Sequence, residues 1–72
     1  MQDTDTVSVH VNGKDRDIPR GITVTGLLEF LDLNPSLVVV ELNREILDRA
    51  RYDEARVEEG DQVELVHFVG GG

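Results

Sequence analysis

The chain contains no cysteine, and its longest apolar runs cover only a few residues. Without cysteine it can form neither a disulfide nor a thiolate metal site. No stretch approaches the roughly 20 apolar residues that a membrane-spanning helix needs. The N-terminus also lacks the basic and then apolar segments of a secretory signal. We therefore expect a cytoplasmic protein that does not enter a membrane and binds no metal.

Basic residues are also scarce, with 7 lysines and arginines against 15 aspartates and glutamates, a net charge of −8. This balance argues against nucleic acid as a partner, because phosphates require a basic surface. A chain of 72 residues predicts a single domain over residues 1–72 that buries only about 60% of its unfolded surface. Such a domain has no room for a deep catalytic cleft. We expect a protein that is not an enzyme and is a monomer when free.

The clearest strand lies near the N-terminus, after a polar arm at residues 1–5 that we expect to be frayed. Residues 6–11 alternate strictly, with a valine at every second position. Asn12-Gly13 follows, and this pair favours a two-residue type I′ hairpin turn. The returning strand, Lys14 to Ile18, has little apolar content and is expected at a sheet edge. Pro19 should end it, because proline cannot donate to a ladder.

The apolar period changes to three and four over Gly21–Leu33, which predicts a helix. Thr23 is a suitable N-cap, since its hydroxyl can accept a free N–H group of the first turn. Gly26 is a poor helix residue and suggests a close approach to the sheet. We expect Asn34-Pro35 to end the helix.

The rest of the chain predicts three strands. Residues 37–42 form an apolar, β-branched run typical of a central strand, with Val39 and Glu41 pointing away from the core. Asn43-Arg44 should turn into a short edge strand at residues 45–47. Residues 48–56 should form a surface connection, with Ala50, Tyr52 and Ala55 as the only anchors. Residues 62–69 should form the last strand.

This order predicts an α+β protein with the ubiquitin-like β-grasp fold. We expect a mixed sheet of four to five strands, in which the first and last strands are central and parallel. One main helix should pack on one face of the sheet. Because a single helix covers only one face, the other face should meet solvent or a partner.

The sequence ends in Gly70, Gly71 and Gly72, directly after the last strand. Glycine has no Cβ, so such a flexible tail can enter narrow clefts, and three extended residues reach at most roughly 10 Å. A tail of this kind could present the carboxylate of Gly72 to another protein's active site. Glycine-rich termini are also often simply disordered, and composition alone favours that interpretation.

Three groups of residues resemble the ThiS family, the sulfur carrier proteins of thiamine biosynthesis. They are the run from Glu59 through Gly-Asp to the terminal glycines, the segment Val40–Asn43 and the helix opening Thr23-Val24. The resemblance covers nearly the whole chain from Val7 onward. The Gly-Asp turn and the final Gly-Gly are shared by ubiquitin-like carriers in general. The short length and the ending Phe68–Gly72 look more like ThiS than like MoaD, the molybdopterin carrier.

The resemblance implies a mechanism and a set of partners. An E1-like, ThiF-like adenylating enzyme would activate the terminal carboxylate with ATP, and a sulfur donor protein would convert it to a thiocarboxylate. A ThiG-like thiazole synthase would then take the sulfur. Gly72 would be the acyl carrier, Gly71 its partner in the terminal pair and Gly70 an extension of the tail. The chain itself would bind no cofactor, because ATP is used by the partner enzyme.

Val39, Val66 and Phe68 predict a partner interface, since they should form one outward apolar patch beside the tail. Scattered surface hydrophobic residues are nevertheless ordinary. His10 and His67 lack further ligands at metal-binding spacing, and His67 could instead line the partner interface.

The residues leave other functions open. A MoaD-like molybdopterin carrier, or a ubiquitin-like modifier conjugated to proteins through Gly72, needs the same fold and tail. A β-grasp binding module with an inert tail is the third alternative.

Overall fold

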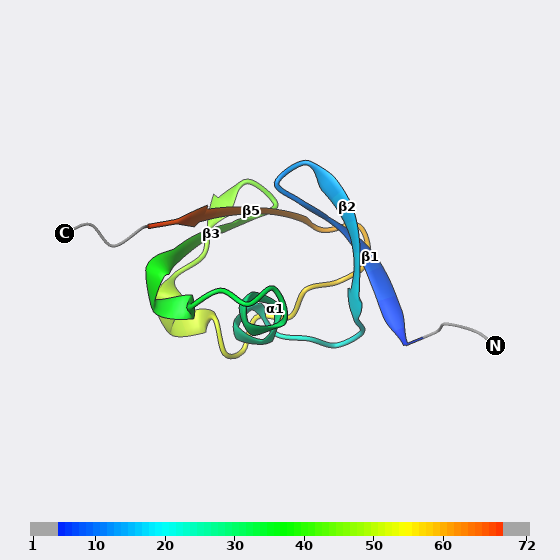
Figure 1. The fold of residues 1–72 in the computed structure, drawn as a ribbon, viewed down its shortest axis with the longest axis horizontal. Coiled ribbons are helices and arrows are strands. Elements are labelled where there is room, and N and C mark those ends of the chain that lie inside the picture. Colours follow the sequence, from blue (N-terminus) through cyan, green and yellow to red (C-terminus); the bar gives the residue numbers. More distant parts are fainter. Residues whose placement is uncertain (1–4, 69–72) are drawn as a thin grey trace.

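The computed structural model describes residues 5–68, which form one mixed five-stranded sheet with a helix on one face (Figure 1). The strand order is β2-β1-β5-β3-β4, with β1 parallel to β5 and every other neighbouring pair antiparallel. This arrangement confirms the predicted ubiquitin-like β-grasp fold. The elements are β1 (Thr6–Val11), β2 (Lys14–Pro19), α1 (Val24–Phe30), the 3₁₀ helix η1 (Pro35–Leu37), β3 (Val38–Leu42), β4 (Glu45–Ile46), the 3₁₀ helix η2 (Arg49–Arg51) and β5 (Gln62–His67).

The first hairpin forms as its sequence predicts. Asn12 and Gly13 have φ angles of 52° and 83°, the two positive values that a type I′ turn requires. The alternating valines of β1 are buried, whereas β2 buries only Ile18. The edge position predicted for β2 is therefore confirmed.

The N-terminus of α1 is capped by Thr23, whose hydroxyl oxygen accepts the Gly26 N–H at 3.1 Å. Gly26 was predicted to allow a close approach of the helix to the sheet, and this interpretation was wrong. A Cβ at this position would lie 2.8 Å from Cγ1 of Ile22, so the close neighbour is the segment before the helix and not the sheet.

The helix ends three residues earlier than its apolar period predicts. Asp32 has φ 66°, a left-handed conformation that stops the helix after Phe30. Its N–H donates to the Glu29 carbonyl at 2.9 Å, and the Leu33 N–H donates to the Leu28 carbonyl at 2.8 Å. These two bonds form a Schellman motif with aspartate in the usual glycine position. Leu33 keeps its apolar contact with the core outside the helix, which explains why the period continued past the true end.

The predicted surface connection at residues 48–56 is anchored to the core by Tyr52, as expected, and this side chain also bonds to β3. Tyr52 is buried, and its hydroxyl accepts the Val40 N–H at 3.1 Å and donates to the Val38 carbonyl at 2.9 Å. The two-residue strand β4 pairs only with the later part of β3, so Tyr52 satisfies the earlier part. Val57, which was not predicted as a core residue, is 1% exposed, whereas the predicted anchor Ala50 is exposed.

Two sequence segments that carry the family resemblance meet in space. The Asn43 side-chain amide donates to Asp61 Oδ1 at 3.1 Å, and its carbonyl oxygen accepts the Gln62 N–H at 2.9 Å. Asp61 Oδ2 in turn accepts the Glu58 N–H at 2.8 Å. The turn after β3 and the turn before β5 are thus held together, which fixes where β5 begins.

Candidate functional site at the end of the last strand

The strand β5 leads from the centre of the sheet to the C-terminal side of the molecule (Figure 1). It ends at His67, whereas the sequence predicted a strand to residue 69; Phe68 follows the strand, and Val69 lies outside the described residues. The predicted carrier residues Gly71 and Gly72 and the tail residue Gly70 lie outside the described residues. The candidate site therefore consists of the surface around the end of β5.

The three residues predicted as a partner interface lie on β3 and at the end of β5, which are neighbouring and antiparallel. Val39 is directly opposite Val66 in the register, and the Phe68 N–H donates to the Leu37 carbonyl at 2.8 Å. Val66 and Phe68 are 55% and 54% exposed, while Val39 is half-buried. Leu37, which sequence analysis did not include, is 37% exposed and lies opposite Phe68. We call Leu37, Val39, Val66 and Phe68 the open-face patch.

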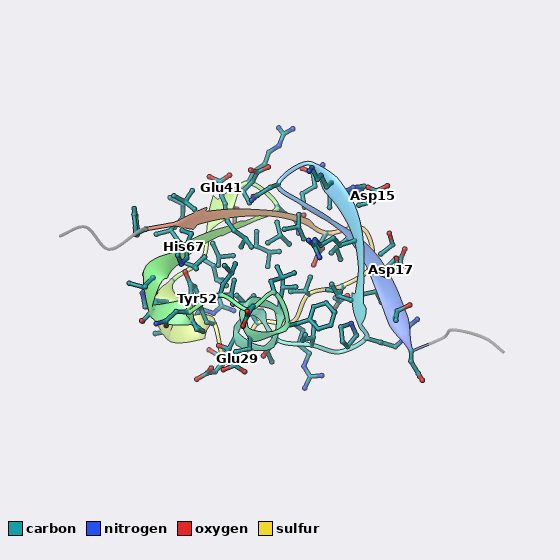
Figure 2. The ribbon with its side chains drawn as sticks, in the orientation of Figure 1. Asp15, Asp17, Glu29, Glu41, Tyr52 and His67 are labelled. Carbon is teal, nitrogen blue, oxygen red and sulfur yellow. The ribbon has the colours of Figure 1, made fainter. Side chains whose placement is uncertain are left out.

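An acidic pair borders the open-face patch. Glu41 and Glu64 are opposite each other one row along the same two strands, and Glu41 points away from α1 (Figure 2). Neither carboxylate takes part in an ion pair with another residue of the described range 5–68. Directly opposed like charges destabilise a sheet. A basic group supplied by a partner would relieve this repulsion.

The two histidines lie apart. His10 pairs across the hairpin with Asp15 at 2.5 Å, on the β1–β2 side of the sheet. His67 is exposed near the end of β5, opposite Val38 of β3 (Figure 2). Between residues 5 and 68 there is no group of three or more residues that could hold a metal ion. None of the helices in that range is long and apolar enough to cross a membrane.

The family model described as "ThiS family" matches residues 9–72 of the chain. The sulfur carrier protein ThiS of Bacillus subtilis is 40% identical over 65 residues, which are 89% of this chain and 98% of that protein.

The fold is similar to a solved ThiS structure. The crystal structure of the thiamine biosynthesis protein ThiS from Geobacter metallireducens superposes with a TM-score of 0.79 at 39% identity. The match covers 92% of this chain and all of that one.

Two further relatives are much longer than this chain. The thiazole synthases of Magnetococcus marinus and Paramagnetospirillum magneticum are each 39% identical to it, over 92% and 86% of its length. The chain spans about one fifth of each of these relatives, 20% and 19% of their lengths. Both therefore contain a segment similar to this chain within a larger protein.

Proposed function

The chain belongs to the ThiS family of sulfur carrier proteins in thiamine biosynthesis, and from that premise we propose that it carries sulfur on the C-terminal carboxylate of Gly72. The observation that carries the proposal is the family match, which runs through β5 to Gly72. The open-face patch lies at the end of β5, just before the C-terminal residues in the sequence. The folded domain binds the partner enzymes, and the C-terminal carboxylate is the group that reacts.

The chemistry starts from a carboxylate, which is a poor electrophile until one of its oxygens becomes a leaving group. An adenylating enzyme forms an acyl-adenylate at Gly72 from ATP and releases pyrophosphate. Sulfide from a donor protein attacks the acyl carbon, AMP leaves, and the product is a thiocarboxylate. When thiazole synthase takes the sulfur, an oxygen atom from water or from the sulfur acceptor replaces it and restores the carboxylate of Gly72. The chain contributes no base or nucleophile, only binding energy that positions its end.

The names of the longer relatives support thiazole synthase as the acceptor. In the two thiazole synthases, a segment similar to this carrier is part of the synthase chain itself. A carrier joined to an enzyme acts at a high effective concentration, which is useful only if the two work together. We therefore propose that this carrier delivers its sulfur to a thiazole synthase.

Intact-mass measurement tests the proposal against conjugation to other proteins. The carrier is incubated with the adenylating enzyme of its own organism, ATP and a sulfide source. Replacement of one oxygen by sulfur adds about 16 Da to the chain, which is the expected result. A ladder of higher-mass protein conjugates in a lysate, with no such mass gain, would support the ubiquitin-like modifier instead. A carrier that still works without Gly71 and Gly72 would point to an inert tail.

A further inference from the structure

The strand β5 continues past the end of its parallel neighbour. β1 pairs with it only through His10 opposite Gln62 and Val11 opposite Val63. The first hairpin then turns back, and its last bond to β5 runs from the Leu65 N–H to Oδ1 of Asn12 at 2.7 Å. Figure 1 shows β5 running on toward the C-terminus beyond the hairpin. One edge of β5 is therefore open over its last residues.

The open edge presents backbone groups in the pattern of an unpaired strand. Even-numbered residues of β5 direct their N–H and C=O groups to the β3 side, as the bond from the Asn43 N–H to the Gln62 carbonyl shows, and Phe68 directly after β5 continues this pattern. The carbonyl of Leu65 and both backbone groups of His67 therefore face the vacated side. None of these three groups has a hydrogen-bond partner within residues 5–68.

A hollow lies beside this edge, on the side of the sheet that α1 covers. Its volume is about 320 Å³, and its apolar lining comes from the core residue Val11 and from three leucines that are partly buried against the core, Leu31, Leu33 and Leu65. Lys14 and Arg16 of β2 also line it. A strand added to β5 would direct every second side chain to this side of the sheet. An apolar side chain there would cover the three leucines.

We propose that the open edge of β5 binds an extended segment of thiazole synthase as an added strand, with an apolar side chain of that segment in the hollow. This inference rests on the proposed carrier function. Unpaired strand edges are templates for pairing with another chain, and backbone bonds provide the affinity in such strand addition. We choose thiazole synthase as the partner because two longer relatives of this chain are thiazole synthases that contain a carrier-like segment in the same polypeptide.

Strand addition at this edge would orient the C-terminal residues toward the active site of the partner. His67 is five residues before Gly72, so pairing at His67 fixes the direction of the chain just upstream of the reacting carboxylate. Holding a reacting group in the right geometry removes much of the entropy cost of its reaction. The open-face patch supplies contacts on the other side of the same strand.

A proline substitution removes the key donor with little expected damage to the fold. His67→Pro deletes an N–H that has no hydrogen-bond partner within residues 5–68, and proline is tolerated on an open strand edge. We expect the variant to fold and its Kd for thiazole synthase to rise at least about tenfold above that of His67→Ala, which removes the side chain alone. Phe68→Pro is the matched control, because it deletes the N–H that pairs with Leu37 and should destabilise the fold.

Hydrogen exchange gives a second measurement that needs no variant. In the free carrier the His67 amide should exchange rapidly, and in the complex with thiazole synthase it should become strongly protected. An unchanged rate in a complex that demonstrably forms would overturn the proposal, as would equal Kd values for His67→Pro and His67→Ala. Protection that arises in the carrier alone, through a dimer seen by sedimentation, would also overturn it. Failure of the carrier function itself would appear differently, as no sulfur mass gain in the wild-type chain.

Discussion

At the scale of single residues, Tyr52 provides hydrogen-bond partners for the backbone of β3, and Arg44 holds a strained backbone conformation. The Tyr52 hydroxyl completes the edge of β3 where β4 does not reach. Arg44 adopts φ 72° in the turn between β3 and β4, although only glycine takes this conformation without strain. The sequence predicted the turn at Asn43-Arg44 and an anchor at Tyr52. It could not predict the hydroxyl bonds, because their partners lie 12 and 14 residues away in a strand.

The substitution Tyr52→Phe should lower the free energy of unfolding by about 1–3 kcal/mol. The change removes one oxygen and leaves the Val40 N–H and the Val38 carbonyl buried without a partner. Urea unfolding followed by circular dichroism measures the effect. An unchanged midpoint would show that water replaces the hydroxyl and that its two bonds contribute nothing.

The substitution Arg44→Gly should raise the free energy of unfolding by about 0.5–1 kcal/mol, because it removes strain from an exposed position. Gly13→Ala, in the other two-residue turn with two positive φ angles, should have the opposite sign. Thermal unfolding of both variants checks the pair. Destabilisation by Arg44→Gly would mean that the arginine side chain makes a contribution larger than the strain it imposes.

At the scale of elements, the periodicity of apolar residues correctly predicted the type of each main helix or strand, but it did not predict where the helix ends. The alternating valines identified β1, and Asn12-Gly13 identified the turn that follows it. The helix was predicted too long because Leu33 continues the apolar spacing beyond the left-handed residue Asp32. Val57 was missed because it is a lone apolar residue among charged neighbours, and only tertiary contacts bury it. Such residues carry no periodic signal.

The junction between the turns around β3 and β5 should depend on Asp61. Asp61→Ala removes the acceptor of both the Asn43 amide and the Glu58 N–H, and should cost about 1–2 kcal/mol of unfolding free energy. Asp17→Ala, on the exposed edge strand β2, is the control and should change stability by less than about 0.5 kcal/mol. If chemical denaturation gave equal losses of unfolding free energy for Asp61→Ala and Asp17→Ala, the bonds of Asp61 would not contribute to positioning β5.

At the scale of the whole molecule, α1 and the open-face patch occupy opposite faces of one sheet, because Val39 and Val66 share the face of Glu41, which points away from α1 (Figure 2). Sequence alternation was sufficient to place Val39, Val66 and Phe68 on the uncovered face, because strand order and residue parity determine it. Leu37 was predicted as the first residue of the strand at 37–42, but it lies in η1 and β3 begins at Val38, so its position opposite Phe68 was missed. The acidic pair was also missed, since opposition of Glu41 and Glu64 depends on the register of two strands. The predicted role of the terminal glycines stays a prediction.

The open-face patch should be needed for partner binding and not for folding. Phe68→Asp places a charge in the patch and should weaken binding to the adenylating enzyme at least about tenfold. Phe30→Asp is the matched control, because Phe30 is 51% exposed against 54% for Phe68 but belongs to α1 on the other layer. Binding is measured by calorimetry on variants whose circular dichroism matches the parent chain. Equal affinities for the two variants would exclude the patch from the interface.

The central claim, that the chain end is the reagent, is tested most directly by locating the added sulfur. The carrier is treated with the adenylating enzyme, ATP and sulfide, and the intact chain is then fragmented in the mass spectrometer. We expect a gain of about 16 Da that is confined to fragments containing Gly72 and absent when ATP is withheld. A gain on fragments that lack Gly72, or no gain from an active adenylating enzyme, would contradict it.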